Sequence, residues 1–458
     1  MPVTRTNVIE DIAALSWSVA ESIAIEAARS AVFLRMGKSL MAVQSMAECK
    51  VRCIFVVMHR PILLTFAVLC TGVTAADAQE WDSVTAEAVA PGVIHRSLVV
   101  NRGPWRMHVL EIDLSTPGLS LIGVRSNDRF RGRETVRSMV SRYKGPGKAV
   151  AGVNGDFFNV KIGTGESENN VLIEGVLWKG VRMTDSPYDT YDNLHSQFGV
   201  DWKNRPFIDR FGLDAEIVER GRRAVRLDGV NFRNDSNSVV LYTPAIGDST
   251  PVDSATSSML AVQLDLVEKR GETTLFRVAR RTREGRSVRL DGGYAIAASG
   301  RGRAFVAALA RRGGTIRIVS RLAPDRGKLR TVVGGWPRLL RHGRSVAEYA
   351  DILEGTFPRF SAGKHPRTAV GFSKDSTKLL LFTVDGRRES DTGMSLAEVA
   401  TMMIALGAHE ALAFDGGGST TMVIDGKVVN RPSDQAGERP VGSGLLVVVV
   451  PPGGGGRH

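Results

Sequence analysis

The chain has 458 residues and a formal net charge of +12 at neutral pH. Its hydrophobic (43%) and charged (24%) fractions are those of a globular protein, which excludes a disordered or fibrous chain. Glycine is abundant, at 49 residues, but follows no Gly-X-Y period, so a collagen-like protein is excluded; 6 Trp and 6 Tyr are few for a base-stacking RNA binder.

Residues 58–78 have the three parts of a secretory signal peptide. A short basic start precedes an apolar run over 62–73, and an Ala-Asp-Ala sequence supplies the small-x-small cleavage pattern. The apolar run is too short to span a bilayer, which needs about 20 residues. Because such signals are N-terminal, we interpret residues 1–57 as a mis-annotated extension ahead of a true start at Met58. A genuine helical extension is the alternative.

The mature chain would begin at Gln79 and contain no cysteine, because Cys49, Cys53 and Cys70 all precede it. A cysteine-free mature chain suits an exported bacterial-type protein, so we expect a periplasmic or secreted location without a stable membrane span after signal cleavage. The basic residues are mostly scattered, as on a solvated surface. Export argues against a nucleic-acid partner and favours an anionic or phosphorylated glycan.

After a short linker over residues 79–90, the chain alternates strands with few helices. Strands are predicted at 107–113 and 119–124, a helix at 134–143, and a buried strand at 149–153. The middle of the chain, about 200–330, is strand-like with many turns.

The C-terminal third has the clearest pattern. A strand over 378–384 precedes a helix over 395–406, which Ser395 and Glu398 begin with a capping box. A strand over 411–414, a hairpin across Asp425-Gly426 and a strand over 445–450 follow. We therefore expect an α+β fold of mixed, mainly antiparallel twisted sheets with a few packed helices. It would form one domain over 91–450, motif-dense over 331–450, with a disordered tail over 451–458.

Polar residues that directly follow buried strands suit an active site, because the strand holds them while the loop leaves them accessible. The run Asp415-Gly416-Gly417-Gly418-Ser419-Thr420 is the strongest such signal. Three consecutive glycines allow successive N–H groups to converge on an oxyanion. A flexible hairpin turn is an equally good interpretation of the spacing alone.

Further segments offer amide, carboxylate, imidazole or guanidinium groups. They are Asn154 with Asp156, His365 with Arg367, Asp385 with Arg387, and the residues Asn430, Arg431, Glu438 and Arg439. The structural alternatives are an Asx turn, a structural histidine, a plain turn and a solvated loop. Few histidines and no mature cysteine disfavour a zinc hydrolase, which leaves carboxylate, amide and arginine chemistry at acetal and phosphate centres.

Taken in order, these segments resemble the phosphodiester glycosidase family over roughly residues 90–450. The matching stretches are 154–158 (NGDFF), 334–340 (GGWPRLL), 365–371 (HPRTAVG), 384–387 (VDGR), 393–398 (GMSLAE), 412–422 (LAFDGGGSTTM), and 429–433 (VNRPS) with 437–440 (GERP). Trp336 departs from the pattern, because a third glycine is expected there.

The resemblance implies hydrolysis of a sugar-1-phosphodiester at the glycosidic C–O bond, which releases free sugar. On this hypothesis Asp415 and Asp156 activate water or stabilise an oxocarbenium ion, while Arg367 holds the phosphodiester with the glycine amides. The other catalytic candidates are Asp385 and Glu438. The substrate-binding candidates are Asn154, His365, Arg387, Gly416, Gly417, Gly418, Ser419, Thr420, Asn430, Arg431 and Arg439.

This chemistry requires no cofactor, although the oxygen donors would suit a divalent cation, for which no ligands are assigned. The alternative function is a non-catalytic module that binds or assembles exported polysaccharide.

Overall fold

The computed structural model describes residues 81–450, except 162, 185, 220–221, 235–236 and 253–257. The predicted extension (1–57), signal peptide (58–78) and tail (451–458) therefore lie outside the described residues. No helix among the described residues has the length and apolar character needed to cross a membrane.

An eight-stranded antiparallel sheet carries most of the predicted motifs. Its strands, in spatial order, are β1 (Ser83–Ala90), β2 (Val93–Val100), β3 (Trp105–Asp113), β22 (Lys378–Val384), β21 (Arg367–Phe372), β23 (Glu410–Phe414), β19 (Arg338–Arg341) and β20 (Arg344–Ser345). The linker expected over 79–90 is therefore wrong at Ser83–Ala90. There the chain pairs with β2, because it turns back at the positive-φ Gly92.

A five-stranded antiparallel sheet lies beside it in the fold. Its strands are β25 (Lys427–Val428), β24 (Met422–Ile424), β5 (Lys148–Asn154), β26 (Ser443–Val449) and β4 (Leu119–Arg125). The predicted type I′ hairpin joins β24 to β25, since Asp425 and Gly426 have φ values of 45° and 74°.

The middle of the chain forms most of a thirteen-stranded sheet. Its strands are β11 (Arg222–Arg226), β10 (Gly212–Glu219), β17 (Thr315–Ala323), β15 (Thr273–Gly285), β14 (Met259–Arg270), β16 (Tyr294–Ala298), β13 (Val239–Tyr242), β12 (Gly229–Val230), β7 (Val176–Val181), β6 (Val171–Ile173), β18 (Leu329–Gly334), β8 (Gln197–Asp201) and β9 (Pro206–Asp209). Its strand pairs are antiparallel except β12 with β13, which is the mixed element of the fold.

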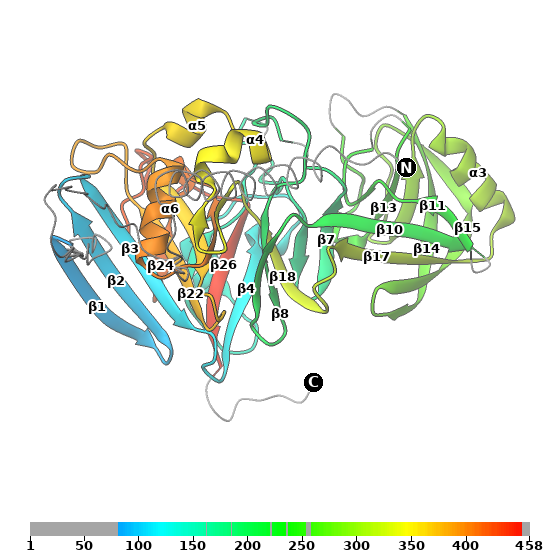
Figure 1. Cartoon of the computed structure of the whole chain (residues 1–458). Coiled ribbons are helices and arrows are strands. Elements are labelled where there is room, and N and C mark those ends of the chain that lie inside the picture. The colour runs from blue at the N-terminus through cyan, green and yellow to red at the C-terminus, as the bar shows by residue number, and fades with distance from the viewer. Residues whose placement is uncertain are drawn as a thin grey trace, which may run out of the picture. The chain divides into compact units, whose positions relative to one another are not determined.

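Few helices cover these sheets, as Figure 1 shows. The α-helices of the described residues are α2 (Val136–Arg142), α3 (Gly302–Arg312), α4 (Ala350–Glu354), α5 (Pro358–Ala362) and α6 (Leu396–Ala405). The prediction of mainly antiparallel sheets with few helices is confirmed. Strand residues outnumber helix residues more strongly than in an even α+β mixture.

Two apolar layers enclose the central strands of the eight-stranded sheet. One layer joins this sheet to β4, β5, β24 and β26 of the five-stranded sheet. The other packs the opposite face against α6, whose buried positions include Leu396, Val399 and Met403. The predicted capping box is present, with Ser395 and Glu398 each accepting a hydrogen bond from the other's backbone. Strands β21 and β22 are therefore buried on both faces.

Strand register brings the predicted motifs to one edge. Arg367, which begins β21, pairs with Val384 at the end of β22, and Thr368 pairs with Phe414 at the end of β23. The residues that follow those strands, Asp385 and Asp415, consequently lie beside the start of β21. The N–H of Asp415 donates to the carbonyl of Gly155 at 3.0 Å, which joins this edge to the end of β5.

Candidate functional site

Asp415 is at the centre of the group that the strand ends assemble. Its carboxylate accepts hydrogen bonds from the Ser419 hydroxyl and from the backbone N–H of Gly416. Burial among protein atoms nevertheless raises the pKa of Asp415 to about 6, and the nearby charge of Asp156 acts in the same direction. Arg439 opposes this rise. Asp415 is therefore a carboxyl group that exchanges its proton near neutral pH while keeping partial solvent exposure.

Asn154 connects the two sheets beneath this carboxyl group. Its Nδ2 donates to the Asp415 carbonyl at 2.7 Å, and its Oδ1 accepts from the Thr368 hydroxyl (2.8 Å) and the Thr421 N–H (3.1 Å). The side chain is fully buried. These contacts use the amide oxygen and one amide N–H for protein–protein bonds, so Asn154 positions the Asp415 loop.

Asp156 lies deeper than Asp415. Both of its carboxylate oxygens accept from Asn169, one from the backbone N–H at 3.0 Å and one from the side-chain amide at 2.8 Å. Burial raises the pKa of Asp156 despite those bonds. Gly334 is required here, because a Cβ at that position would lie 2.3 Å from the Asp156 carboxyl carbon.

Glu168 is the third member of a carboxyl cluster that also contains Asp156 and Asp415. It was not among the predicted residues. It is 6% exposed, and its Oε1 has no hydrogen-bond partner within the part of the chain that the structure describes. Burial raises the pKa of Glu168 to about 8, and the charges of Asp156 and Asp415 add to the rise. The carboxyl group is thus mostly protonated at neutral pH. The only sequence signal for it is the polar run Ser167-Glu168-Asn169-Asn170, which has neither strand nor helix periodicity.

Tyr188 faces the same cluster. Burial raises the pKa of its phenol, and the charges of Glu168 and Asp415 add to this. A neutral hydroxyl therefore stands beside the two carboxyl groups. No motif in the sequence pointed to this residue.

The glycine run does not form the predicted anion nest. The Gly416 N–H donates to the Asp415 carboxylate, and the Gly417 N–H donates to the Pro366 carbonyl at 2.8 Å. Two of the three amides are therefore used within the protein. The glycines are instead needed for space: a Cβ on Gly416 would lie 2.8 Å from the Pro366 carbonyl oxygen, and one on Gly418 would lie 2.0 Å from an Arg439 nitrogen.

Arg367 is 3% exposed and is held from several sides. Its Nε donates to the Met394 carbonyl (3.0 Å) and its Nη2 to the carbonyls of Phe360 (2.6 Å) and Gly363 (2.9 Å). Burial lowers the pKa of Arg367 to about 10, and Arg387 contributes to the lowering. Arg367 thus supports the loop before β21 while its charge acts on Asp415.

Arg387 and His365 lie next to Arg367. Arg387 is exposed, adopts a φ of +65°, and has its guanidinium close to Gly417, where a Cβ would lie 2.8 Å from Nη2. Burial, Arg367 and Arg387 lower the pKa of His365, which favours a neutral imidazole. Its Nδ1 is buried with no partner within the described ranges.

Arg439 supplies the cation nearest to the glycine run. Asp434 holds its guanidinium through bonds of 2.7 Å and 3.0 Å, and its Nη1 lies 3.5 Å from the Ser419 hydroxyl. Its charge acts on Asp415. Arg387 and Arg439 therefore place two positive charges around the Asp415 loop.

The Asp385 group is organised differently. Its Oδ1 accepts from the Arg431 N–H (2.9 Å) and from Asn430 (3.3 Å), and Asn430 also bonds the Thr420 carbonyl and the Met422 N–H. Burial raises the pKa of Asp385 to about 6. These residues tie the end of β22 to the loop after β25.

Glu438 points to a helix rather than to the cluster. Its Oε1 accepts the N–H of Arg137 at 2.9 Å, and Val136 also donates a backbone bond, so it caps the N-terminus of α2. Burial raises the pKa of Glu438. These contacts favour a structural role.

Trp336, the departure from the family pattern, builds an aromatic layer behind Arg367. It stacks on Phe360 and His195 at ring-centroid distances of 4.9 and 5.0 Å, and Arg367 lies over the Phe360 ring. The indole N–H donates to the Glu354 carbonyl at 2.7 Å, so this tryptophan is a packed core residue.

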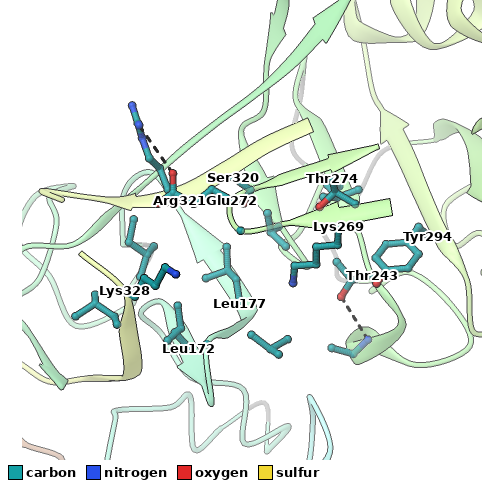
Figure 2. Close-up of a pocket in the computed structure, with 18 of the residues that line it drawn as sticks. Leu172, Leu177, Thr243, Lys269, Glu272, Thr274, Tyr294, Ser320, Arg321 and Lys328 are labelled. Atoms are coloured by element: carbon teal, nitrogen blue, oxygen red, sulfur yellow. Dashed lines mark hydrogen bonds and ion pairs between the residues drawn. The ribbon is translucent and has the colours of Figure 1, made fainter. Parts of the chain in front are cut away.

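One cavity is lined by a member of the carboxyl cluster, and a larger one is not. A cavity of about 260 Å³ is lined by Glu168 together with Ser167, Glu166, Lys179, Arg131 and Phe232. A larger one, of about 610 Å³, is shown in Figure 2 and is lined by residues such as Leu172, Leu177, Lys269, Tyr294 and Lys328. No predicted site residue lines the larger cavity.

Comparisons with known proteins place these motifs in a family context. Residues 265–448 match the family model described as phosphodiester glycosidase. The N-acetylglucosamine-1-phosphodiester alpha-N-acetylglucosaminidase of Mus musculus is 33% identical over 103 residues, which are 21% of this chain and 20% of that protein. The matched stretch thus spans about a fifth of the mouse protein's length.

Two solved structures share the fold. A hypothetical protein from Synechocystis has a TM-score of 0.65 and 19% identity, with 80% of this chain and 64% of that chain covered. A chain from Burkholderia pseudomallei K96243 titled "Putative exported protein" has a TM-score of 0.59 and 23% identity, with 76% and 74% covered. The resemblance predicted over roughly residues 90–450 is confirmed for residues 265–448, which match the phosphodiester glycosidase family.

Proposed function

We propose that this chain is an exported hydrolase that cleaves the sugar C–O bond of a sugar-1-phosphodiester and releases free sugar. The observation that carries the proposal is the cluster of Asp156, Glu168 and Asp415, in which the pKa of Glu168 is raised to about 8 and that of Asp415 to about 6. Paired carboxyl groups with separated pKa values are the arrangement needed for acid–base work at an acetal centre.

The pKa values assign the two roles. At neutral pH Asp415 is mostly ionised. It accepts a proton from the attacking water while the oxygen of that water bonds to the anomeric carbon. Glu168 is mostly protonated and donates a proton to the phosphate oxygen as the C–O bond breaks. Solvent then restores both groups. Asp156 acts through its neighbours, because its charge raises the pKa of each.

The cations beside the cluster suit the phosphate group. Arg387 is exposed and Arg439 is held by Asp434, so both guanidinium groups can meet an anion near the glycine run. Phosphodiester recognition is further supported by the family match and by the substrate named for the mouse relative. Export is supported by the signal pattern over 58–78.

The test is an assay of reducing-sugar release from UDP-sugars and other sugar-1-phosphodiesters by the purified protein. Asp415→Asn should lower turnover at least about 100-fold, the lower range for loss of a general base. Asp265→Asn is the matched control, because Asp265 is an exposed aspartate on β14. Folding of both variants is checked by circular dichroism.

Two outcomes would contradict the proposal. Glycan that is bound and recovered unchanged would indicate the alternative, a polysaccharide-binding module. An Asp415→Asn rate within about threefold of wild type, under 1 kcal/mol in activation free energy, would remove Asp415 from the chemistry. We propose that no cofactor is required, so chelator should leave the rate unchanged.

A further inference from the structure

Three side chains with metal-binding donors meet far from the carboxyl cluster. His342 lies in the turn between β19 and β20, Glu410 begins β23, and His409 directly precedes it. One donor atom from each of the three lies within 4.8 Å of the others. Asp415 follows the other end of β23, five residues away, which corresponds to about 16 Å of extended chain. The group is therefore separate from the site described above.

The two spacings from Glu410 to the histidines match those of a small tetrahedral coordination shell. The Glu410 Oε1 lies 3.0 Å from the His342 Nδ1 and 3.5 Å from the His409 Nδ1. Bonds of about 2.0–2.2 Å from zinc to nitrogen and oxygen place two tetrahedral ligands about 3.3 Å apart. Two imidazoles and one carboxylate are a ligand set typical of zinc sites with an open fourth position.

The surrounding contacts hold the three ligands in place. Arg338 bonds the Glu410 Oε2, and the His342 N–H donates to Oε1 at 2.9 Å. The Gly343 N–H donates to the His409 carbonyl at 2.7 Å, so the β19–β20 turn is tied to the start of β23. Ligands that are positioned before the metal arrives bind it more tightly, because less ordering remains to be done.

We propose that His342, His409 and Glu410 bind a zinc-like divalent cation that clamps the β19–β20 turn onto β23. The side chains of His342 and His409 are 74% and 25% exposed, so the cation can enter from solvent and keep a water at its fourth position. The nitrogen ligands favour zinc over magnesium, which prefers oxygen. A cation held here stabilises the native state without taking part in turnover.

The test is equilibrium dialysis of the full chain against zinc, with magnesium as the comparison ion. The variants are His342→Asn, which tolerates the φ of +52° at this position, and His409→Ala. Each should bind one zinc equivalent fewer than wild type, or bind that equivalent at least about 100-fold more weakly, because loss of a ligand exceeds the usual 10–100-fold effect of an outer contact. Cys49, Cys53 and Cys70 are present in every protein, so their zinc binding cancels in the difference.

Arg341→Ala is the matched control, because it alters the same turn and keeps all three ligands. It should retain the zinc equivalent, and zinc should raise the thermal midpoint of wild type and Arg341→Ala but not of His342→Asn. The exposed position of His342 makes that variant informative even if His409→Ala fails to fold. Equal zinc stoichiometry and affinities within threefold for wild type and His342→Asn would overturn the proposal.

Discussion

Two of the cavities formed by the described residues differ in the side chains that line them. The cavity beside Glu168 is about 260 Å³ and is lined by carboxyl and ammonium groups, among them Glu166 and Lys179, 3.1 Å apart. The cavity in Figure 2 is more than twice as large, at about 610 Å³, and its walls are mainly apolar, with Lys269 and Lys328 among the lining residues. No predicted site residue lines either cavity, and Glu168 of the carboxyl cluster lines the smaller one.

The candidate site is therefore marked by carboxyl groups with raised pKa values, and not by the larger cavity volume. Burying a carboxyl group without full compensation costs free energy, and here that cost appears as the raised pKa values of Glu168 and Asp415. Strongly perturbed groups gather at functional sites, although ion pairs within a structural network perturb pKa values as well. Substitution of Glu168, which lines the smaller cavity, and of Lys269, which lines the larger one, separates the two by experiment.

The largest effect is expected for Glu168→Gln. Gln keeps the size and polarity of the side chain but cannot donate the proton, so kcat should fall by about 100- to 10,000-fold while the free energy of unfolding is kept. Glu174→Gln is the control, because Glu174 is an exposed residue paired with Arg330, and such pairs contribute little. A Glu168→Gln rate equal to that of the control would show that the cluster is structural.

Asn154→Ala tests whether the carboxyl cluster depends on the hydrogen bonds that Asn154 makes between the eight-stranded and five-stranded sheets. It removes the partner of the Asp415 carbonyl, the Thr368 hydroxyl and the Thr421 N–H, so the free energy of unfolding should fall by about 2–4 kcal/mol. Asn101→Ala, at an exposed position, should change it by less than about 0.5 kcal/mol. Urea denaturation of both variants measures the difference; equal midpoints would contradict the assigned role.

The pH dependence of kcat/KM should be bell-shaped. The base must be ionised, so the rate should fall as pH drops through about 6, the pKa of Asp415; the acid must be protonated, so it should fall as pH rises through about 8, the pKa of Glu168. Each limb should approach a tenfold change per pH unit.

Two variants sharpen the assignment of the limbs. Glu168→Gln should remove the basic limb from the residual activity and keep the acidic one. Asp385 also has a pKa of about 6, so Asp385→Asn must retain the acidic limb if Asp415 is responsible for it. Loss of the acidic limb in Asp385→Asn would mean that Asp385, which follows β22, is the base instead of Asp415.

The parts of this site that were predictable from sequence are the local ones. A buried strand followed by a polar residue identified Asp385 and Asp415, and the capping box of α6 and the hairpin at Asp425-Gly426 follow from neighbouring residues alone. Strand register then brings Asp385 and Asp415 to one edge, because β22 and β23 both pair with β21.

The remaining features depend on contacts between distant segments. Glu168 lies in a stretch without periodicity, and its burial results from packing that joins it to Asp156 and Asp415. The glycine amides were expected to face a ligand, but the carbonyl of Pro366, 51 residues earlier in the chain, accepts the hydrogen bond of the Gly417 N–H. Glu438 was placed in the site by its motif, while the structure shows it capping α2.

The smallest effect is expected from the cavity of Figure 2. Lys269 lines it from β14 and is exposed, and none of the perturbed carboxyl groups contributes to its walls. Lys269→Ala should therefore leave kcat/KM for a sugar-1-phosphodiester within about threefold of wild type, under 1 kcal/mol. The assay is the same reducing-sugar release, run beside Glu168→Gln. A loss of tenfold or more in Lys269→Ala would mean that the substrate reaches into the larger cavity, and the separation between the two cavities would no longer hold.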